Sequence, residues 1–263
     1  MDQQFVDACR AGDLAGARLR PDPSRETLQT VLWYACGEGA LTLAQWLHAT
    51  FALTADDVRA ANNHALGALC HMGHLEFLKW LHSEFALTAS DVRTNSCYAL
   101  IMSCFRGHLE TAKWLHSTFD LTADDARSSD NSAIRLACAY GHLEVAKWLF
   151  ATFALDVADL RWRCDTGNST LCWTCKYGHL EVVEWLFDTV GLTAADVRGS
   201  GDYESICASH SAEIIDVLFR ALERDGSEPA GLRGKTLAKY KAARERVQAA
   251  RLAAQMRIKP AAC

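Results

Sequence analysis

Two short motifs and the histidines are the residues of this sequence whose types and spacing could do chemistry. Cys172-x-x-Cys175 has the spacing of half a zinc site or of a redox pair, and the segment GLRGKT (231–236) resembles the end of a phosphate-binding loop. Both are incomplete, because no second cysteine pair lies at zinc-ribbon distance and Pro229 stands where the phosphate loop needs its first glycine. We therefore expect no metal, no nucleotide and no other cofactor.

The ten histidines could bind a metal or act as acids and bases, but most of them recur at fixed intervals. Four follow a glycine, and three more form a second column. These are His74, His108, His142 and His179, and then His48, His82 and His116. A catalytic group is needed once and in a unique pocket, so repetition indicates a structural role. No nucleophile, base and orienting acid stand out from this pattern, and we expect a protein that is not an enzyme.

The elements that carry these histidines repeat along the chain. Gly-His-Leu-Glu recurs at Gly73, Gly107, Gly141 and Gly178, with steps of 34 residues and one of 37. Such a period, carried by helical patterns, indicates a solenoid of stacked helix pairs in which glycine ends one helix and the glutamate enters the first turn of the next. A tryptophan follows each turn glycine by seven residues, and we expect this column in the core. Its members are Trp46, Trp80, Trp114, Trp148 and Trp185.

The segment 131–150, NSAIRLACAYGHLEVAKWLF, resembles an ankyrin repeat through Gly-His-Leu-Glu-Val-Ala-Lys-Trp-Leu and the small pair Ala137-Cys138. The resemblance covers roughly residues 3–222 and implies an all-α, ankyrin-type solenoid of about seven stacked helix-turn-helix repeats, to which the sequence adds a basic C-terminal helix. The family's Thr-Pro-Leu-His opening is degenerate here, and its Gly-Ala-Asp-Val-Asn ending is missing. With these departures from the family's motif, the chain resembles the divergent ankyrin proteins of protists and of large DNA viruses.

The period predicts an ankyrin-like array over residues 1–225 and a basic tail, also helical, over 226–263. The expected repeats are about 1–25, 26–59, 60–93, 94–127, 128–161, 162–198 and 199–225. The first repeat is short and atypical, and the last, centred on His210, is degenerate. Both features are expected of units that cap the two ends.

The linkers between repeats follow their own rule. Thr54 precedes Asp57 by three residues, and this capping-box spacing recurs in every linker, which predicts a short third helical turn in place of a β-hairpin finger. Each turn ends in an arginine, and the five arginines should form a ladder. They are Arg59, Arg93, Arg127, Arg161 and Arg198. They either pair with neighbouring aspartates or stay free to meet an anionic partner.

Charge is distributed unevenly along the chain. The net charge is −5, but residues 231–263 hold nine Lys and Arg against the single acid Glu245, which leaves 18 basic and 31 acidic residues in 1–230. A narrow apolar stripe runs along this basic segment at helical spacing: Leu237, Tyr240, Ala243, Val247, Ala250 and Ala254. The tail either folds onto the acidic array as an extra cap, stays solvated, or docks weakly to nucleic acid, an anionic membrane or an acidic protein.

The remaining composition indicates an intracellular monomer. No apolar run approaches the roughly 20 residues of a membrane helix, and no signal-like segment opens the sequence. A cysteine stands three residues before the turn in every repeat, at Cys9, Cys36, Cys70, Cys104, Cys138, Cys175 and Cys207. Cysteines in a repeating column of this kind are typical of a reduced, cytoplasmic protein, with the nucleus as another compartment open to it.

The resemblance implies where partners bind, because in ankyrin-like repeats the two residues before each turn glycine face a concave groove. The candidate anchors at these positions are Met72, Phe105, Arg106, Tyr140, Lys176 and Tyr177. Trp162 and Arg163 join them from a linker three residues longer than its sisters, which should bulge at the groove's edge unless Trp162 folds back on its repeat. The aromatic candidates either bind a partner or pack between repeats.

The function expected from the sequence is therefore that of a non-catalytic protein-binding module or scaffold. The alternative is nucleic-acid or anionic-membrane binding through residues 231–263, with the repeats only as a scaffold.

Overall fold

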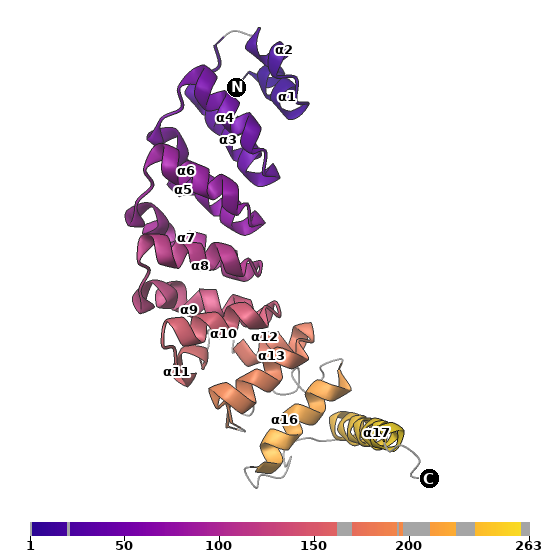
Figure 1. Cartoon of the computed structure of the whole chain (residues 1–263). Coiled ribbons are helices and arrows are strands. Elements are labelled where there is room, and N and C mark those ends of the chain that lie inside the picture. Colours follow the sequence, from indigo (N-terminus) through magenta and orange to yellow (C-terminus); the bar gives the residue numbers. More distant parts are fainter. Residues whose placement is uncertain are drawn as a thin grey trace. The chain divides into compact units, whose positions relative to one another are not determined.

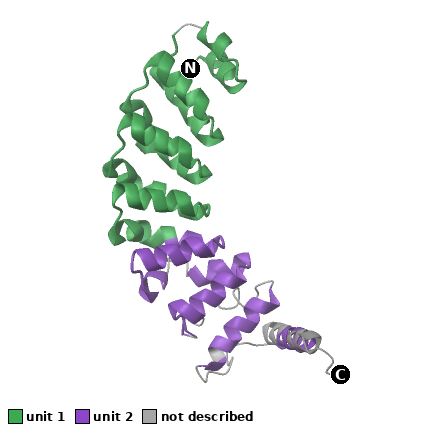
Figure 2. Ribbon diagram, in the orientation of Figure 1, with its two compact units in different colours: residues 1–133 green, residues 134–263 purple. Residues whose placement is uncertain are grey.

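The structure is a computed structural model that describes residues 2–19, 22–161, 170–193, 195–196, 211–224 and 235–258. In this part of the chain every regular element is a helix and there is no strand (Figure 1). Two compact units divide the chain, residues 1–133 and residues 134–263 (Figure 2). The predicted all-α solenoid of helix-turn-helix repeats is confirmed, whereas the predicted seven-repeat division stays a prediction.

The first unit consists of helix pairs. Its helices are α1 (Gln3–Arg10), α2 (Leu14–Arg18), α3 (Arg25–Glu38), α4 (Leu41–Phe51), α5 (Ala55–Met72), α6 (Leu75–Phe85), α7 (Ala89–Phe105), α8 (Leu109–Phe119) and the start of α9 (Ala123–Ala139). Helix α3 packs on α5 and α5 on α7, and each of these first helices also contacts the second helix of its own pair. The predicted short opening unit corresponds to α1 and α2.

The second unit holds the rest of α9 and the helices that follow it. These are α10 (Leu143–Thr152), α11 (Val157–Leu160), α12 (Thr170–Tyr177), α13 (Leu180–Trp185), the π-helical turn η1 (Leu186–Val190), α16 (Ala212–Arg224) and α17 (Lys235–Ile258). Helix α16 packs on α13 and corresponds to the second helix predicted for the degenerate last repeat. His210, the predicted turn of that repeat, lies outside the described residues.

Each helix pair is joined by the predicted glycine turn. The glycines at 39, 73, 107, 141 and 178 all have positive φ. At Gly73, where φ is +75°, the chain leaves α5, and the N–H of His74 donates to the carbonyl oxygen of Leu69 over 3.0 Å. Helix α6 then begins at Leu75 with Glu76 in its first turn, where the helix dipole favours an acid.

The tryptophan column is not the core, which corrects the sequence prediction. Only Trp185 is buried, and the four other members are half-buried. The leucine after each tryptophan is the core residue instead, and Leu81 and Leu115 are both 0% exposed. Successive residues of a helix point about 100° apart, so when the leucine faces the neighbouring helices the tryptophan lies on the flank. There the ring of Trp114 packs edge-on to Phe119, with 5.5 Å between centroids.

The linkers contain the predicted third helical turn, closed by the predicted capping box. The N–H of Thr54 donates to Asp57 Oδ2 over 2.8 Å, and equivalent bonds occur in the later linkers. After this turn the chain reverses through three successive left-handed residues, at 61–63, 95–97 and 129–131. Asn63 holds one reversal, because its Nδ2 donates to the carbonyl oxygen of Asp91 over 3.0 Å.

The basic tail forms the predicted helix, α17, which packs against α16. Val247 is buried, and Arg244 forms an ion pair with Glu223 of α16 at 2.5 Å. Ala250, which the sequence placed in the apolar stripe, is exposed instead. The described helices include none long and apolar enough to cross a membrane.

Candidate binding surface

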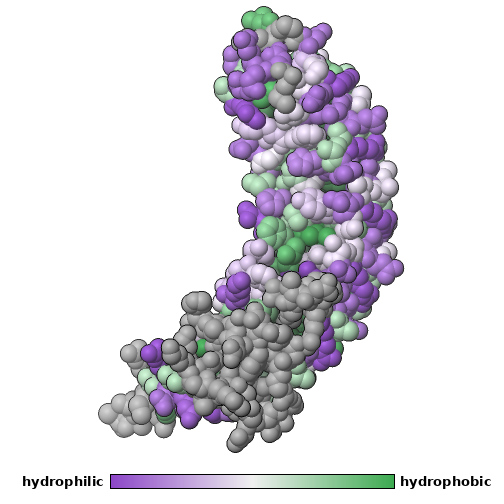
Figure 3. All heavy atoms as spheres, turned by 180° about the vertical axis from the view of Figure 1, so that it is seen from behind, coloured by the Kyte–Doolittle hydropathy of each residue, from purple (hydrophilic) through white to green (hydrophobic). Residues whose placement is uncertain are grey.

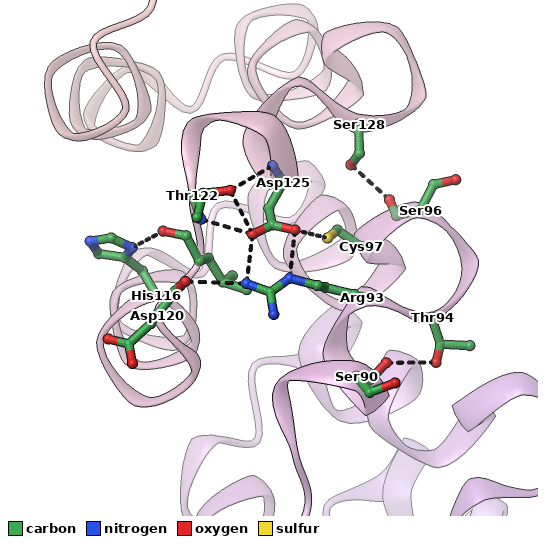
Figure 4. A network of polar contacts seen from close by, with 11 residues as sticks. Ser90, Arg93, Thr94, Ser96, Cys97, His116, Asp120, Thr122, Asp125 and Ser128 are labelled. Carbon is green, nitrogen blue, oxygen red and sulfur yellow. Dashed lines mark hydrogen bonds and ion pairs between the residues drawn. The ribbon is translucent and has the colours of Figure 1, made fainter.

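The predicted arginine ladder exists and is made of ion pairs between neighbouring linkers. Arg93 illustrates it: its Nε donates to Asp125 Oδ1 over 2.9 Å, and its Nη2 to Asp125 Oδ2 over 3.0 Å (Figure 4). The same Nη2 donates to the carbonyl oxygen of Asp120 over 3.2 Å. Arg59 pairs in the same way with Asp91 at 2.7 Å, and Arg161 with Asp196 at 2.8 Å.

Each aspartate of the ladder belongs to two linkers at once. Asp125 caps its own helical turn through Thr122 and also receives Arg93 and, at 3.5 Å, the thiol of Cys97 (Figure 4). Burial alone would raise the pKa of Asp125, but the hydrogen bonds from Arg93 and Thr122 outweigh it and lower the pKa to about 2. These arginines are therefore structural, and of the two interpretations of the ladder the pairing one holds for Arg59, Arg93 and Arg161. Arg198 lies outside the described residues.

The histidine columns are structural, as predicted, and they connect neighbouring repeats. The ring of His108 lies over Gly73 of the preceding repeat, and its Nε2 donates to the carbonyl oxygen of His71 over 3.1 Å. His74 lies over Gly39 in the same manner. Burial lowers the pKa of His108, and the hydrogen bond to His71 opposes this shift only in part.

The second histidine column closes the ends of the second helices. Nδ1 of His82 donates to the carbonyl oxygen of Leu87 over 3.0 Å, and the ring packs edge-on to Phe119 of the next repeat, 5.1 Å between centroids. His48 and His116 form the same backbone bond. Most histidines of the first unit are thus used in holding repeats together.

The predicted anchors of the first unit lie at the ends of α5 and α7. Met72 is 42% exposed, Arg106 is exposed and Phe105 is half-buried. Phe105 packs on His71 with 5.9 Å between ring centroids, and the guanidinium carbon of Arg106 lies 6.0 Å from the centroid of the Phe105 ring. Burial and the nearby charge of Arg106 lower the pKa of His71, which favours its neutral form. Phe105 therefore both packs between repeats and remains accessible.

The predicted anchors of the second unit gather around a pocket. Tyr140 and Tyr177 are 42% and 45% exposed, and their ring centroids lie 5.4 Å apart. Trp173 stacks on Tyr177 at 5.5 Å, and Nζ of Lys176 lies 4.5 Å from the centroid of the Trp173 ring. A depression of about 190 Å³ opens among Arg135, Leu136, Ala139, Tyr140, Thr170, Trp173 and Tyr177, and we call it the aromatic pocket.

Sequence reasoning missed several residues of this pocket. Leu136 and Trp173 stand four residues before Tyr140 and Tyr177, so one helical turn separates them from predicted anchors. Extending the search from the two residues before each turn glycine by one helical turn toward the N-terminus would have found both. Trp162 and Arg163, the anchors predicted on the long linker, lie outside the described residues.

Figure 3 shows one face of the molecule, on which hydrophobic residues gather in patches among hydrophilic ones. In the described part of the chain no three His, Cys, Asp or Glu side chains are grouped so that they could hold a metal. Cys172 and Cys175 are both buried, and neither forms a disulfide within the described residues.

The comparisons with known proteins agree with this geometry. A family model described as ankyrin repeats (3 copies) matches residues 66–159 and 100–198. The crystal structure of the human ASB11 ankyrin repeat domain is similar to the chain with a TM-score of 0.52 and 18% identity, over 81% of this chain and 96% of that one. At this identity the likeness concerns the fold alone. No curated protein matches the sequence.

Proposed function

Because this protein belongs to the ankyrin-repeat family, whose repeats are generally non-catalytic modules for protein–protein interaction, we propose that it binds a protein partner through the ends of its first helices. The observation that carries the proposal is the exposure of large side chains at these helix ends. Met72, Tyr140 and Tyr177 are each more than 40% exposed, on helices whose other large apolar residues are mostly buried.

The chemistry of these positions supports partner binding. Methionine, tyrosine and arginine are enriched at the centres of protein interfaces, where a few such anchors account for most of the binding energy. The helices that carry them are fixed by the glycine turns, the histidine columns and the arginine ladder, so a partner meets anchors whose positions are already set. Preorganisation of this kind lowers the entropic cost of association.

We place the binding event in a reducing compartment. The eight described cysteines are all buried and form no disulfide with one another, in contrast to the disulfide framework that small secreted domains use. Burial raises the pKa of Cys104 to about 12, so its thiol stays protonated and unreactive at neutral pH.

Affinity purification from an extract of the source cells tests the proposal, with the full chain as bait and mass spectrometry as readout. Phe105→Ala combined with Tyr140→Ala should lose the partner. Because Phe105 also packs on His71, the thermal midpoint of this variant is measured alongside to confirm that it remains folded at the temperature of the purification. Tyr98→Ala is the matched control, because Tyr98 is 40% exposed but is not one of the anchors. Retention of every partner by the double variant would refute binding at the helix ends.

The alternative is that the basic helix α17 binds nucleic acid or an anionic membrane. Lys241 and Arg246 are both exposed on it. Reversing their charges with Lys241→Glu and Arg246→Glu in the same purification distinguishes the two functions. Capture that depends on these bases, and that weakens steeply as salt rises, would assign the function to the tail.

A further inference from the structure

We propose that the aromatic pocket of the second unit binds an acidic segment of a protein partner through one aromatic anchor residue. This inference rests on the proposed function and names the chemistry of the ligand at one part of the surface.

The walls of the pocket select an aromatic or similarly large apolar side chain. Three rings, Tyr140, Trp173 and Tyr177, form much of its lining, with the aliphatic side chain of Leu136 beside them. Its volume of about 190 Å³ is that of a single ring with its linking atoms, since an apolar protein cavity of about 150 Å³ accepts benzene. Ring faces and edges attract one another beyond the area that they bury.

The polar groups at the pocket are donors or cations. Arg135 lines it, and Lys176 stands over Trp173 at 4.5 Å. Thr170 also lines it and is 2% exposed, and its Oγ1 is buried without a hydrogen-bond partner in the described part of the chain. None of the lining residues that the structure describes is an acid.

The same arrangement disfavours a cationic ligand. Aromatic pockets often hold cations over their ring faces. Here the chain's own Lys176 already lies over the ring of Trp173, where a cationic ligand would otherwise bind. A carboxylate next to the anchor ring therefore meets attraction from Lys176, whereas an ammonium or guanidinium group meets repulsion.

Three synthetic peptides test this, titrated into the full chain by isothermal calorimetry. One carries phenylalanine flanked by two glutamates on each side, the second has alanine in place of phenylalanine, and the third has lysines in place of the glutamates. We expect the first to bind at least about tenfold tighter than either of the others, and its affinity to fall with added salt.

Variants locate the binding. Trp173→Ala and Lys176→Glu should each weaken the affinity for the glutamate peptide at least about tenfold. Lys176→Glu should also reduce the ratio between the affinities for the glutamate peptide and the lysine peptide. Lys176 is exposed, so this variant is read out without loss of folding, and Tyr98→Ala on α7 should leave the titration unchanged. Equal or tighter binding of the lysine peptide, no binding of any peptide, or indifference to Lys176→Glu would overturn the proposal.

The two proposals fail in different ways. If Phe105→Ala alone removes the captured partner while the peptides do not bind, the protein-binding function stands and the aromatic-pocket inference falls. If the glutamate peptide binds and Trp173→Ala weakens it, but capture depends on neither Phe105 nor Tyr140, the ligand chemistry assigned to the pocket stands and the proposal that the captured partner binds at the helix ends falls.

Discussion

Replacing Gly73 by alanine tests whether the first histidine column holds neighbouring repeats together. Gly73 has φ of +75°, and an added Cβ would lie 2.5 Å from Nδ1 of the His108 ring. The left-handed backbone costs alanine about 1–2 kcal/mol. The His108 ring must also shift, which weakens its 3.1 Å hydrogen bond to His71, and a typical bond of this kind contributes about 0.5–1.5 kcal/mol. We expect Gly73→Ala to lower the free energy of unfolding by about 2–3 kcal/mol.

Gly178 is the matched control, because its φ is +84° and an added Cβ there would meet no atom of the described residues within 4 Å. Gly178→Ala should therefore cost only the backbone term of about 1–2 kcal/mol. Urea unfolding followed by circular dichroism measures both variants. In a background of His108→Ala the cost of Gly73→Ala should fall to that of the control, and the cycle isolates the contact between the two residues. Equal costs for Gly73→Ala with and without His108 would refute the reasoning.

Two further predictions follow from the packing and the charges. Trp114→Ala should cost about 2–3 kcal/mol in urea titration, less than the about 3–5 kcal/mol of a fully buried aromatic, because Trp114 is half-buried on the flank of α8; a loss above about 4 kcal/mol would place this ring in the core after all. The pKa of Asp125 is lowered to about 2, so its contribution to stability is complete above the unfolded-state value of about 4 and is lost as the pH falls from about 4 to about 2. In a pH series, Asp125→Asn should make the thermal midpoint less dependent on pH across this range. A pH dependence as steep as that of the unsubstituted chain would count against a stabilising role of the ladder.

Much of the fold could be predicted from the sequence because it is local and periodic. The turn at Gly141, the capping box of Thr54 and Asp57 and the pairing of Arg93 each need residues at a fixed offset along one chain, and repetition makes such offsets visible. The sequence period does not show how deeply a repeated residue is buried. A period of 34 residues shows that Trp114 recurs, but only the direction of its side chain relative to Leu115 decides which of the two is buried.

The candidate site was predicted in part for a related reason. Tyr140 and Tyr177 hold the same place in successive repeats and were found by their register. Trp173 and Thr170 recur in no other repeat, so no column marks them, and only the three-dimensional structure shows that they line the pocket. The left-handed reversals were also missed, since Asn62 and Asn63 tolerate that backbone but Ser96 and Cys97 give no such signal.

The shared aspartates of the arginine ladder have a consequence for how such a chain can change its length. Asp91 and Asp125 each complete their own linker and receive an arginine from the linker before, always with the same donor and acceptor atoms. One linker of the first unit is therefore chemically interchangeable with the next at this junction. Removing or duplicating 34 residues in phase would join an arginine to a new but equivalent aspartate. A gain or loss out of phase would leave a buried carboxylate without its cation, so recombination between repeats is tolerated only in whole units.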